Sequence, residues 1–149
     1  MKSTLCASAG LLLLCVSLSA AATLGEDVRS VAADQAQMEA ALEITGAGKF
    51  SLHQLRLPTG TVVREYVSPS GMVFAVTWRG PVPPDLQQVL GRFFEDYAAA
   101  VRPQDAGSGS RGVQRTGLVA QSGGHMRAFF GRAYLQQMLP RGVTIEEIR

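Results

Sequence analysis

The two histidines, His53 and His125, are the side chains of this 149-residue chain that exchange a proton most readily near neutral pH. Neither has a second histidine or a carboxylate two to four residues further along, so the spacing typical of a metal site is missing. No G-x-S-x-G sequence is present to place a nucleophilic serine. We therefore predict no metal ion and no catalytic residue. The alternative is a hydrolase in which His53 or His125 lies beside an acid in the folded chain.

Residues 107–112 read Gly-Ser-Gly-Ser-Arg-Gly and match the G-x-G-x-x-G pattern of dinucleotide-binding loops. Such a loop needs a strand before it and a helix after it, so that the pyrophosphate meets the helix N-terminus. Here the neighbouring patterns predict the reverse order, a helix before the motif and a strand after it. The motif is therefore interpreted as part of a flexible linker near 102–112, and no cofactor is predicted.

A removable secretion signal is predicted for residues 1–22. Lys2 supplies the positive start, residues 5–18 form a short apolar run, and the small residues that end at Ala22 form the cleavage site. The run is shorter than the ~20 apolar residues that cross a bilayer. Both cysteines lie inside this segment, so the mature domain, residues 23–149, can form no disulfide and no thiolate metal site. The predicted location is the periplasm or the cell exterior.

The mature domain is predicted to be nearly neutral. The signal contains one of the 14 basic residues and none of the 12 acidic ones, which leaves a net charge of +1. The basic residues are interleaved with acidic ones, whereas a nucleic-acid-binding protein concentrates them in a patch. No stretch after residue 22 is long and apolar enough to span a membrane. The sequence thus indicates neither a nucleic-acid partner nor a transmembrane segment in the mature domain.

The mature domain is expected to be a single α+β unit. Hydrophobic periodicity predicts helices at 26–42 and 85–101 and a last helical turn at 144–149. Asp85 suits the N-cap of the second helix. Alternating and β-branched runs, separated by turn residues, predict strands at 50–57, 61–67, 72–79, 113–120 and 126–135. The expected architecture is an antiparallel sheet of about five strands, a three-strand meander and a two-strand hairpin around a turn at 122–124, with helices on one face.

Glu65 is the most informative position in the predicted meander. If residues 68–71 form the loop, Glu65 shares a face with apolar residues that form a core: Val63, Val67, Met72, Phe74, Val76 and Trp78. A lone buried carboxylate is costly, so Glu65 needs a partner, access to solvent or a raised pKa. Three outcomes are open: a β-bulge turns it outward, an arginine such as Arg127 or Arg132 pairs with it, or it is a functional acid.

The opposite face of the same hairpin carries Arg64, Tyr66 and Arg79 among apolar residues. This face is more apolar than a solvated surface needs to be, so either the C-terminal segments cover it or it contacts a partner. Coverage by the protein's own chain is the preferred interpretation. Since aromatic and arginine side chains dominate binding hot spots, we take Arg64, Glu65, Tyr66, Arg79 and Arg127 as candidate binding residues.

A family resemblance rests on three stretches: residues 57–67 (LPTGTVVREYV), residues 73–78 (VFAVTW) followed by residues 84–86 (PDL), and residues 122–129 (SGGHMRAF). With residues 22–25 (ATLG) at the expected cleavage point and the ending Ile148-Arg149, they resemble a family of exported proteobacterial proteins catalogued as domain of unknown function 2844. The resemblance spans essentially the whole mature chain. It implies an exported domain and assigns no activity, cofactor or catalytic residue.

The sequence as a whole favours a non-catalytic binding or assembly module at the cell envelope, with an envelope or secreted protein as its partner. Besides the hydrolase, one further alternative is a carrier of a small apolar ligand. That alternative requires an apolar cavity between the 85–101 helix and the sheet.

Overall fold

The computed structural model describes residues 24–100, 111–115 and 117–149. The predicted signal and most of the predicted linker lie outside these residues. The described chain forms three helices, α1 (Arg29–Gln37), α2 (Leu86–Leu90) and α3 (Phe94–Ala100), and seven strands, β1 (Ala41–Ala47), β2 (Phe50–Arg56), β3 (Val62–Val67), β4 (Val73–Gly80), β5 (Arg111–Arg115), β6 (Leu118–His125) and β7 (Ala128–Leu135).

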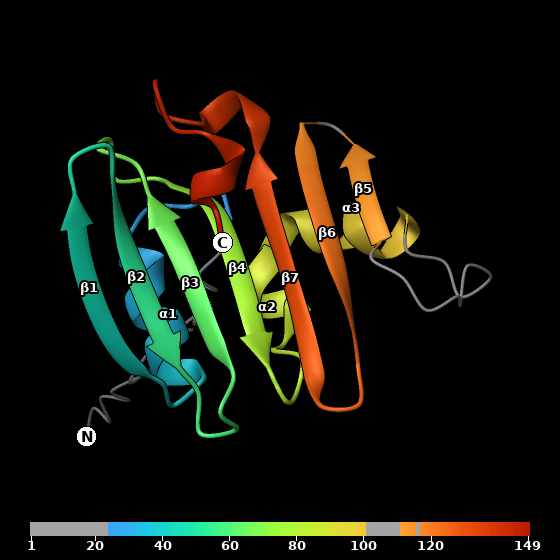
Figure 1. The fold of residues 1–149 in the computed structure, drawn as a ribbon. Coiled ribbons are helices and arrows are strands. Elements are labelled where there is room, and N and C mark those ends of the chain that lie inside the picture. The colour runs from blue at the N-terminus through green and yellow to red at the C-terminus, as the bar shows by residue number, and fades with distance from the viewer. Residues whose placement is uncertain (1–23, 101–110, 116) are drawn as a thin grey trace, which may run out of the picture.

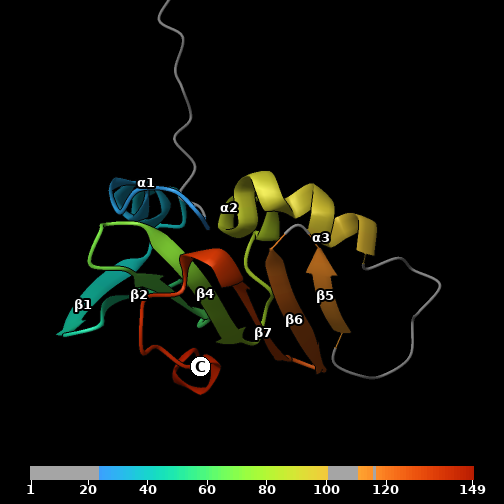
Figure 2. The same ribbon diagram turned by 90° about the horizontal axis from the view of Figure 1, so that it is seen from above.

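All seven strands belong to one antiparallel sheet in the order β1-β2-β3-β4-β7-β6-β5 (Figure 1). The three α-helices lie on one face of the sheet, and the last part of the chain, which ends at the C-terminus, lies on the other face (Figure 2). The prediction of an α+β fold with an antiparallel sheet and helices on one face is confirmed. The predicted count of about five strands is too low, because two of the strands were not predicted as separate strands.

The first strand outside the prediction is β1, whose start lies within the range predicted as a helix, 26–42. Helix α1 ends at Gln37, and Glu39 adopts a φ of 51°, which a continuing right-handed helix does not contain. The chain then reverses and pairs with β2 from Ala41 onward. The apolar residues at 42 and 44 fit a strand as well as a helix, so their spacing alone did not separate the two.

The second such strand is β5, which occupies the end of the expected linker and the start of the expected strand at 113–120. That stretch divides near Gly117, where φ is 83°, and Arg111–Arg115 pairs back onto β6.

The turn expected at 122–124 also lies elsewhere, since these residues continue β6 and the chain reverses at Met126 and Arg127. Both residues have positive φ, 44° and 69°, as in a two-residue hairpin turn.

The helix predicted at 85–101 is interrupted at Gly91. This glycine has a φ of 47° and begins a 3₁₀ turn, Gly91–Phe93, which separates α2 from α3. The apolar stripe nevertheless faces the sheet as expected, since Val89, Leu90 and Tyr97 share a buried cluster with Trp78. The prediction of Asp85 as the N-cap is confirmed, because its carboxylate accepts hydrogen bonds from two main-chain amides of α2.

Replacing this cap provides a direct test of its contribution. We expect Asp85→Ala to lower the free energy of unfolding by about 1 kcal/mol, because the two amides lose their acceptor. Asp85→Asn retains a side-chain oxygen and is expected to remain close to the wild type. Urea unfolding of the three proteins measures both differences, and equal stabilities of the alanine and asparagine variants would contradict the assignment.

The β3–β4 hairpin contains the β-bulge that was one of the open outcomes for Glu65. Tyr66 pairs with Ala75 while Val67 pairs with Val73, which leaves Phe74 as the extra residue. The bulge turns Phe74 to the face away from the helices, where it packs with Tyr66, so its predicted place in the helix-side core was wrong. Val63, Val76 and Trp78 remain in the helix-side core as predicted. Glu65 comes before the bulge in β3, and its side chain remains buried. The bulge therefore does not turn Glu65 outward.

None of the helices within the described ranges combines the length and the apolar character that a membrane crossing requires.

Candidate functional site

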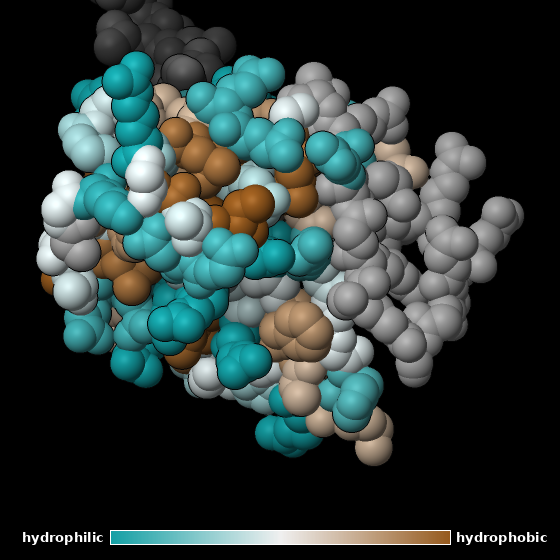
Figure 3. Space-filling model, turned by 45° about the horizontal axis from the view of Figure 1, so that its top comes forward, coloured by the Kyte–Doolittle hydropathy of each residue, from teal (hydrophilic) through white to brown (hydrophobic). Residues whose placement is uncertain are grey.

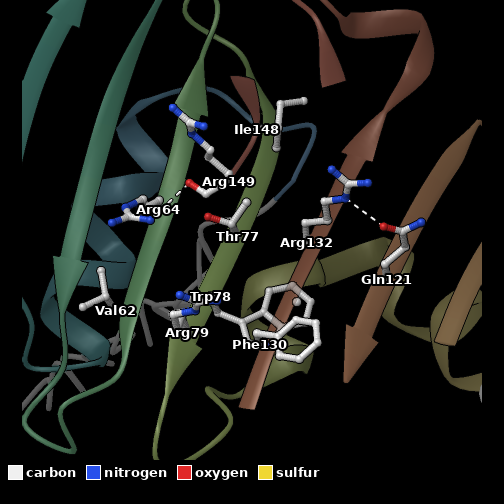
Figure 4. Close-up of a pocket in the computed structure, with 11 residues that line it drawn as sticks. Val62, Arg64, Thr77, Trp78, Arg79, Gln121, Phe130, Arg132, Ile148 and Arg149 are labelled. Atoms are coloured by element: carbon white, nitrogen blue, oxygen red, sulfur yellow. Dashed lines mark hydrogen bonds between the residues drawn. The ribbon is translucent and has the colours of Figure 1, made fainter. Parts of the chain in front are cut away.

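A pocket of about 710 Å³ opens on the sheet face that points away from the helices (Figure 4). Strands β3, β4, β6 and β7 and the end of the chain supply its lining: Val62, Arg64, Thr77, Trp78, Arg79, Gln121, Phe130, Gly131, Arg132, Ile148 and Arg149. In the space-filling view of this side of the molecule, hydrophilic residues predominate and hydrophobic ones form small separate groups (Figure 3). The pocket lining itself combines arginine side chains with apolar residues, among them Val62, Trp78 and Phe130.

The strand register explains why these side chains meet. Thr77 pairs with Arg64 on one side and with Arg132 on the other, so the three residues form one row across β3, β4 and β7. Arg79 pairs with Phe130 in the neighbouring row. Residues two apart in a strand share a face, so both rows open onto the same side of the sheet. Because the short Thr77 stands between two long arginine side chains, the middle of the row is hollow.

Two of the arginines are oriented by amide side chains on adjacent strands. Arg64 Nε donates to Gln54 Oε1 at 3.0 Å, and Arg132 Nε donates to Gln121 Oε1 at 2.9 Å. Arg132 Nη1 also donates to the main-chain oxygen of Ile145 at 3.4 Å. A guanidinium has more N–H donors than these bonds use, so each group is held in place and still able to bind a ligand.

The charge of the pocket has one sign. Four arginines, Arg64, Arg79, Arg132 and Arg149, line it, and among the described residues no aspartate or glutamate does, although Glu146 interacts with the charge of Arg132 from outside the lining. The ion pairs among the described residues involve other basic side chains, those of Arg29, Lys49, Arg56 and Arg92. A terminal carboxylate at Arg149, the last residue of the sequence, would offset one of the four positive charges and leave an excess of positive charge.

The C-terminal residues form one wall of the pocket. Tyr66 Oη donates to the main-chain oxygen of Arg149 at 2.7 Å and accepts from the Arg149 amide at 2.9 Å. Arg64 Nη1 donates to the same oxygen at 3.1 Å. Ile148 is fully buried in a cluster with Tyr66, Phe74 and other apolar residues. The C-terminal segment therefore covers the Tyr66 half of this face, as predicted, and leaves the half around Arg79 open.

Behind the pocket, on the helix side of the sheet, Glu65 lies in a second polar cluster. Its side chain is 2 % exposed and hydrogen-bonds to Asp34 of α1, which is fully buried. Gln88 of α2 donates from Nε2 to Asp34 Oδ1 at 2.6 Å. The partner of Glu65 is thus a second carboxyl group. The proposed pairing with Arg127 or Arg132 was wrong, because Arg132 lies on the opposite face and Arg127 in the β6–β7 turn.

Burial raises the pKa of Glu65 well above its usual range, and the neighbouring Asp34 carboxylate and their mutual hydrogen bond raise it further. The raised pKa favours protonated Glu65, whose hydroxyl can donate to the Asp34 carboxylate. His53 of β2 pairs with Glu65 across the strands. Burial lowers the pKa of His53, since desolvation disfavours the charged imidazolium.

The residues of the hydrolase alternative are only partly brought together. Ser51 Oγ lies 3.3 Å from His53 Nε2, so a hydroxyl does contact the histidine. Within the described part of the chain, His53 Nδ1 is buried and no hydrogen bond reaches it, so Glu65 does not orient the ring as a triad acid would. His125 is exposed beside the β6–β7 turn. Residues 24–100, 111–115 and 117–149 contain no group of three or more metal-ligating side chains.

A family model described as "Protein of unknown function (DUF2844)" matches residues 20–148. The chain belongs to this family. No curated protein and no solved structure matches the chain. The match confirms the resemblance found in the sequence.

In this DUF2844 chain the five candidate binding residues are distributed over three places. Arg64 and Arg79 line the pocket, and Tyr66 holds the chain end at its wall. Glu65 lies on the opposite side of the sheet, and Arg127 lies exposed in the β6–β7 turn. The fold adds four residues to the pocket that were not predicted as binding residues: Gln121, Phe130, Arg132 and Arg149. Phe130 and Arg132 are two residues apart, so the sequence could have placed them on one face of the same strand. Because the turn was predicted at 122–124, the strands beside that strand were not identified correctly.

Proposed function

We propose that the mature domain of this DUF2844 protein is an exported, non-catalytic binding or assembly module of the cell envelope. We further propose that its partner is an envelope or secreted protein and that the arginine-lined pocket is its binding site. Export is supported by the basic start, short apolar run and small-residue exit of residues 1–22. Under this proposal, the buried Asp34–Glu65 pair maintains the fold and the pocket binds the partner.

One observation carries the proposal: of the residues that the structure describes, four arginines and no acidic residue line the pocket. Hydrogen bonds from a guanidinium to an anionic acceptor are about twice as strong as neutral ones, so such a pocket favours a negatively charged group. Phe130, which is 43 % exposed, adds an apolar surface of the kind found in binding hot spots. The apolar-ligand carrier is less well supported, because its cavity was expected on the helix side and this pocket opens on the opposite face.

Capture of partners from envelope extracts tests this function. The bait is the exported protein with an affinity tag placed directly after the predicted signal, so that the C-terminal wall of the pocket stays intact. We expect the double variant Arg79→Ala/Arg132→Ala to capture at least about tenfold less of the partner than the wild type, because it removes two charge-assisted contacts. Quantitative mass spectrometry of the eluates measures the difference.

The control for this experiment is the double variant Arg29→Ala/Arg92→Ala. It removes the same amount of charge, but Arg29 and Arg92 pair with acids outside the pocket. Its capture is expected to equal that of the wild type. If both double variants lost the partner equally, net charge would explain the binding and the pocket would not.

A further inference from the structure

We propose that the pocket binds an extended acidic peptide segment of the partner, with its carboxylates held by Arg79 and Arg132. This inference rests on the proposed function and adds the chemical class of the ligand and its mode of binding. It is carried by three features: the way this face already holds the chain's own end, the position of the two arginines, and the apolar wall beside them.

The end of the chain shows how this face holds a peptide. Ile148 is extended, with φ and ψ of −90° and 91°, and its side chain is fully buried against the apolar cluster. Tyr66 and Arg64 bond the main chain of Arg149. Many peptide-binding sites work in this way: an apolar pocket takes one side chain of the peptide, and polar groups of the protein bond its main chain. The open half, around Arg79, lies next to the Tyr66 half that the C-terminal residues cover.

The open half has the charges that a carboxylate requires. Arg79 pairs with Phe130 while Arg132 pairs with Thr77, so the two arginines are diagonal neighbours on adjacent strands. Diagonal positions are within reach of long side chains across a sheet. Thr77 and Phe130 occupy the other two corners of this group of four positions, and the short Thr77 side chain leaves space beside Arg132. In Figure 4 the Arg132 guanidinium points toward Gln121 and away from Arg79, so two acidic side chains of one extended peptide can each meet one guanidinium, and such pairs favour bidentate geometry.

The apolar wall favours a peptide over a simple anion. Phe130 is 43 % exposed and lines the pocket beside Arg79, and Val62 lines it from β3. A phosphate ion gains nothing from these groups, whereas a peptide with an apolar residue next to its acidic one buries both. In an extended peptide, successive side chains point to opposite sides, so acidic and apolar residues can alternate between the arginines and the aromatic wall.

A defined peptide tests the inference. The ¹⁵N-labelled exported protein is titrated with an N-acetylated, C-amidated pentapeptide of alternating glutamate and leucine and followed by NMR. Saturable shifts are expected in the amides of β3, β4 and β7. The matched peptide of glutamine and leucine is expected to bind at least about tenfold more weakly, because it lacks the charge-assisted bonds.

Three variants locate the binding. Arg132→Gln is expected to weaken glutamate-peptide binding about tenfold, and Thr77→Leu is expected to weaken it similarly by filling the hollow without changing the charge. Arg29→Gln, which lies outside the pocket, is expected to leave it unchanged. The spread of the amide spectrum shows that each variant is folded. Equal affinity for the glutamate and glutamine peptides would overturn the inference.

Inorganic phosphate separates this inference from the proposed function. If phosphate saturated the pocket amides and the glutamate peptide did not, the peptide inference would fall and an anion-binding pocket would stand. If neither probe shifted the pocket amides and the Arg79→Ala/Arg132→Ala variant captured partners normally, both proposals would fall.

Discussion

Replacing Glu65 by alanine is expected to lower the free energy of unfolding by about 3 kcal/mol, the upper end of the loss typical when a buried polar group loses its hydrogen-bond partner, because the acceptor here is a carboxylate. Asp34 and Glu65 are 0 % and 2 % exposed, so the Asp34 carboxylate cannot turn to water when the proton donated by Glu65 is removed. Gln88 still donates to Asp34 Oδ1, but one amide replaces only part of the hydration of a carboxylate. The expected loss far exceeds that for an exposed pair such as Arg29–Asp27.

Glu65→Gln is the matched variant for this prediction. It nearly preserves the volume of the side chain, and its amide N–H can donate to Asp34 as protonated Glu65 does. Because the amide does not titrate, the variant is expected to lose the part of the pH dependence of stability that comes from Glu65. Near neutral pH it is expected to be much more stable than Glu65→Ala.

The direction of this pH dependence follows from the raised pKa of Glu65 in the folded chain. Below its ordinary pKa of 4.5 the folded and unfolded chains both hold the proton, and the contribution of Glu65 to stability is fully present. Above 4.5 the unfolded chain releases its proton first, so the free energy of unfolding falls until the pH has passed the folded-state pKa. His53 acts in the opposite direction, because its pKa is lowered and its contribution is lost as the pH falls below 6.5.

Urea unfolding of wild type and Glu65→Gln between about pH 4 and pH 9 measures this effect. Contributions from His53 and from surface acids are common to both proteins and cancel in the difference. The wild type is expected to become less stable relative to the variant as the pH rises. A difference that stays constant over this range would show that Glu65 titrates normally in the folded protein.

Gly131→Ala is expected to destabilise the domain by about 1 to 3 kcal/mol, the usual cost of overpacking a core. Gly131 lies directly opposite Trp78 in the β4–β7 pair. A Cβ atom at this position would clash with the Trp78 ring and would lie 2.9 Å from the main-chain oxygen of Gln121. Trp78 is 4 % exposed and packed in the helix-side core, so the ring has little room to move aside.

Fluorescence offers a local readout of this clash, since Trp78 is the only tryptophan of the chain. The emission of the folded Gly131→Ala protein is expected to shift as the ring is displaced, together with a lower urea midpoint. Gly46→Ala is the control, because nothing lies within 4 Å of a Cβ atom built there, and its effect is expected to stay within about 0.5 kcal/mol. If the two variants were equally stable, the packing of Trp78 on Gly131 would be disproved.

The fold could be predicted where the determining signals are local. Asp85 caps α2, and Thr144 and Glu147 form the expected capping box of the last turn. The strands on either side of the turn at 68–71 were predicted within a residue or two, since alternation and turn residues both indicate them. The prediction was wrong where one stretch satisfied two periodicities, as at β1, or where a glycine run resembled a turn but continued a strand, as at 122–124.

The candidate site depended on contacts between distant parts of the chain. The sequence identified Arg64 and Arg79 as neighbours on one face and Glu65 as a costly residue on the other. It did not indicate that Arg132 joins the first two, because that requires β7 to pair with β4. It did not identify Asp34 as the partner of Glu65, because that requires α1 to pack across the sheet.

The sequence by itself determined the family, the α+β class, the helix caps and the face on which each residue of β3 lies. These properties depend on interactions between residues a few positions apart, which the order of residues specifies directly. Only the tertiary structure decided the arginine pocket and the buried carboxyl pair. The hydrogen bonds of these two sites join residues as far apart as Arg64 and Arg149, or Asp34 and Gln88. Such contacts form only when strand register, the bulge at Phe74 and helix packing are all in place.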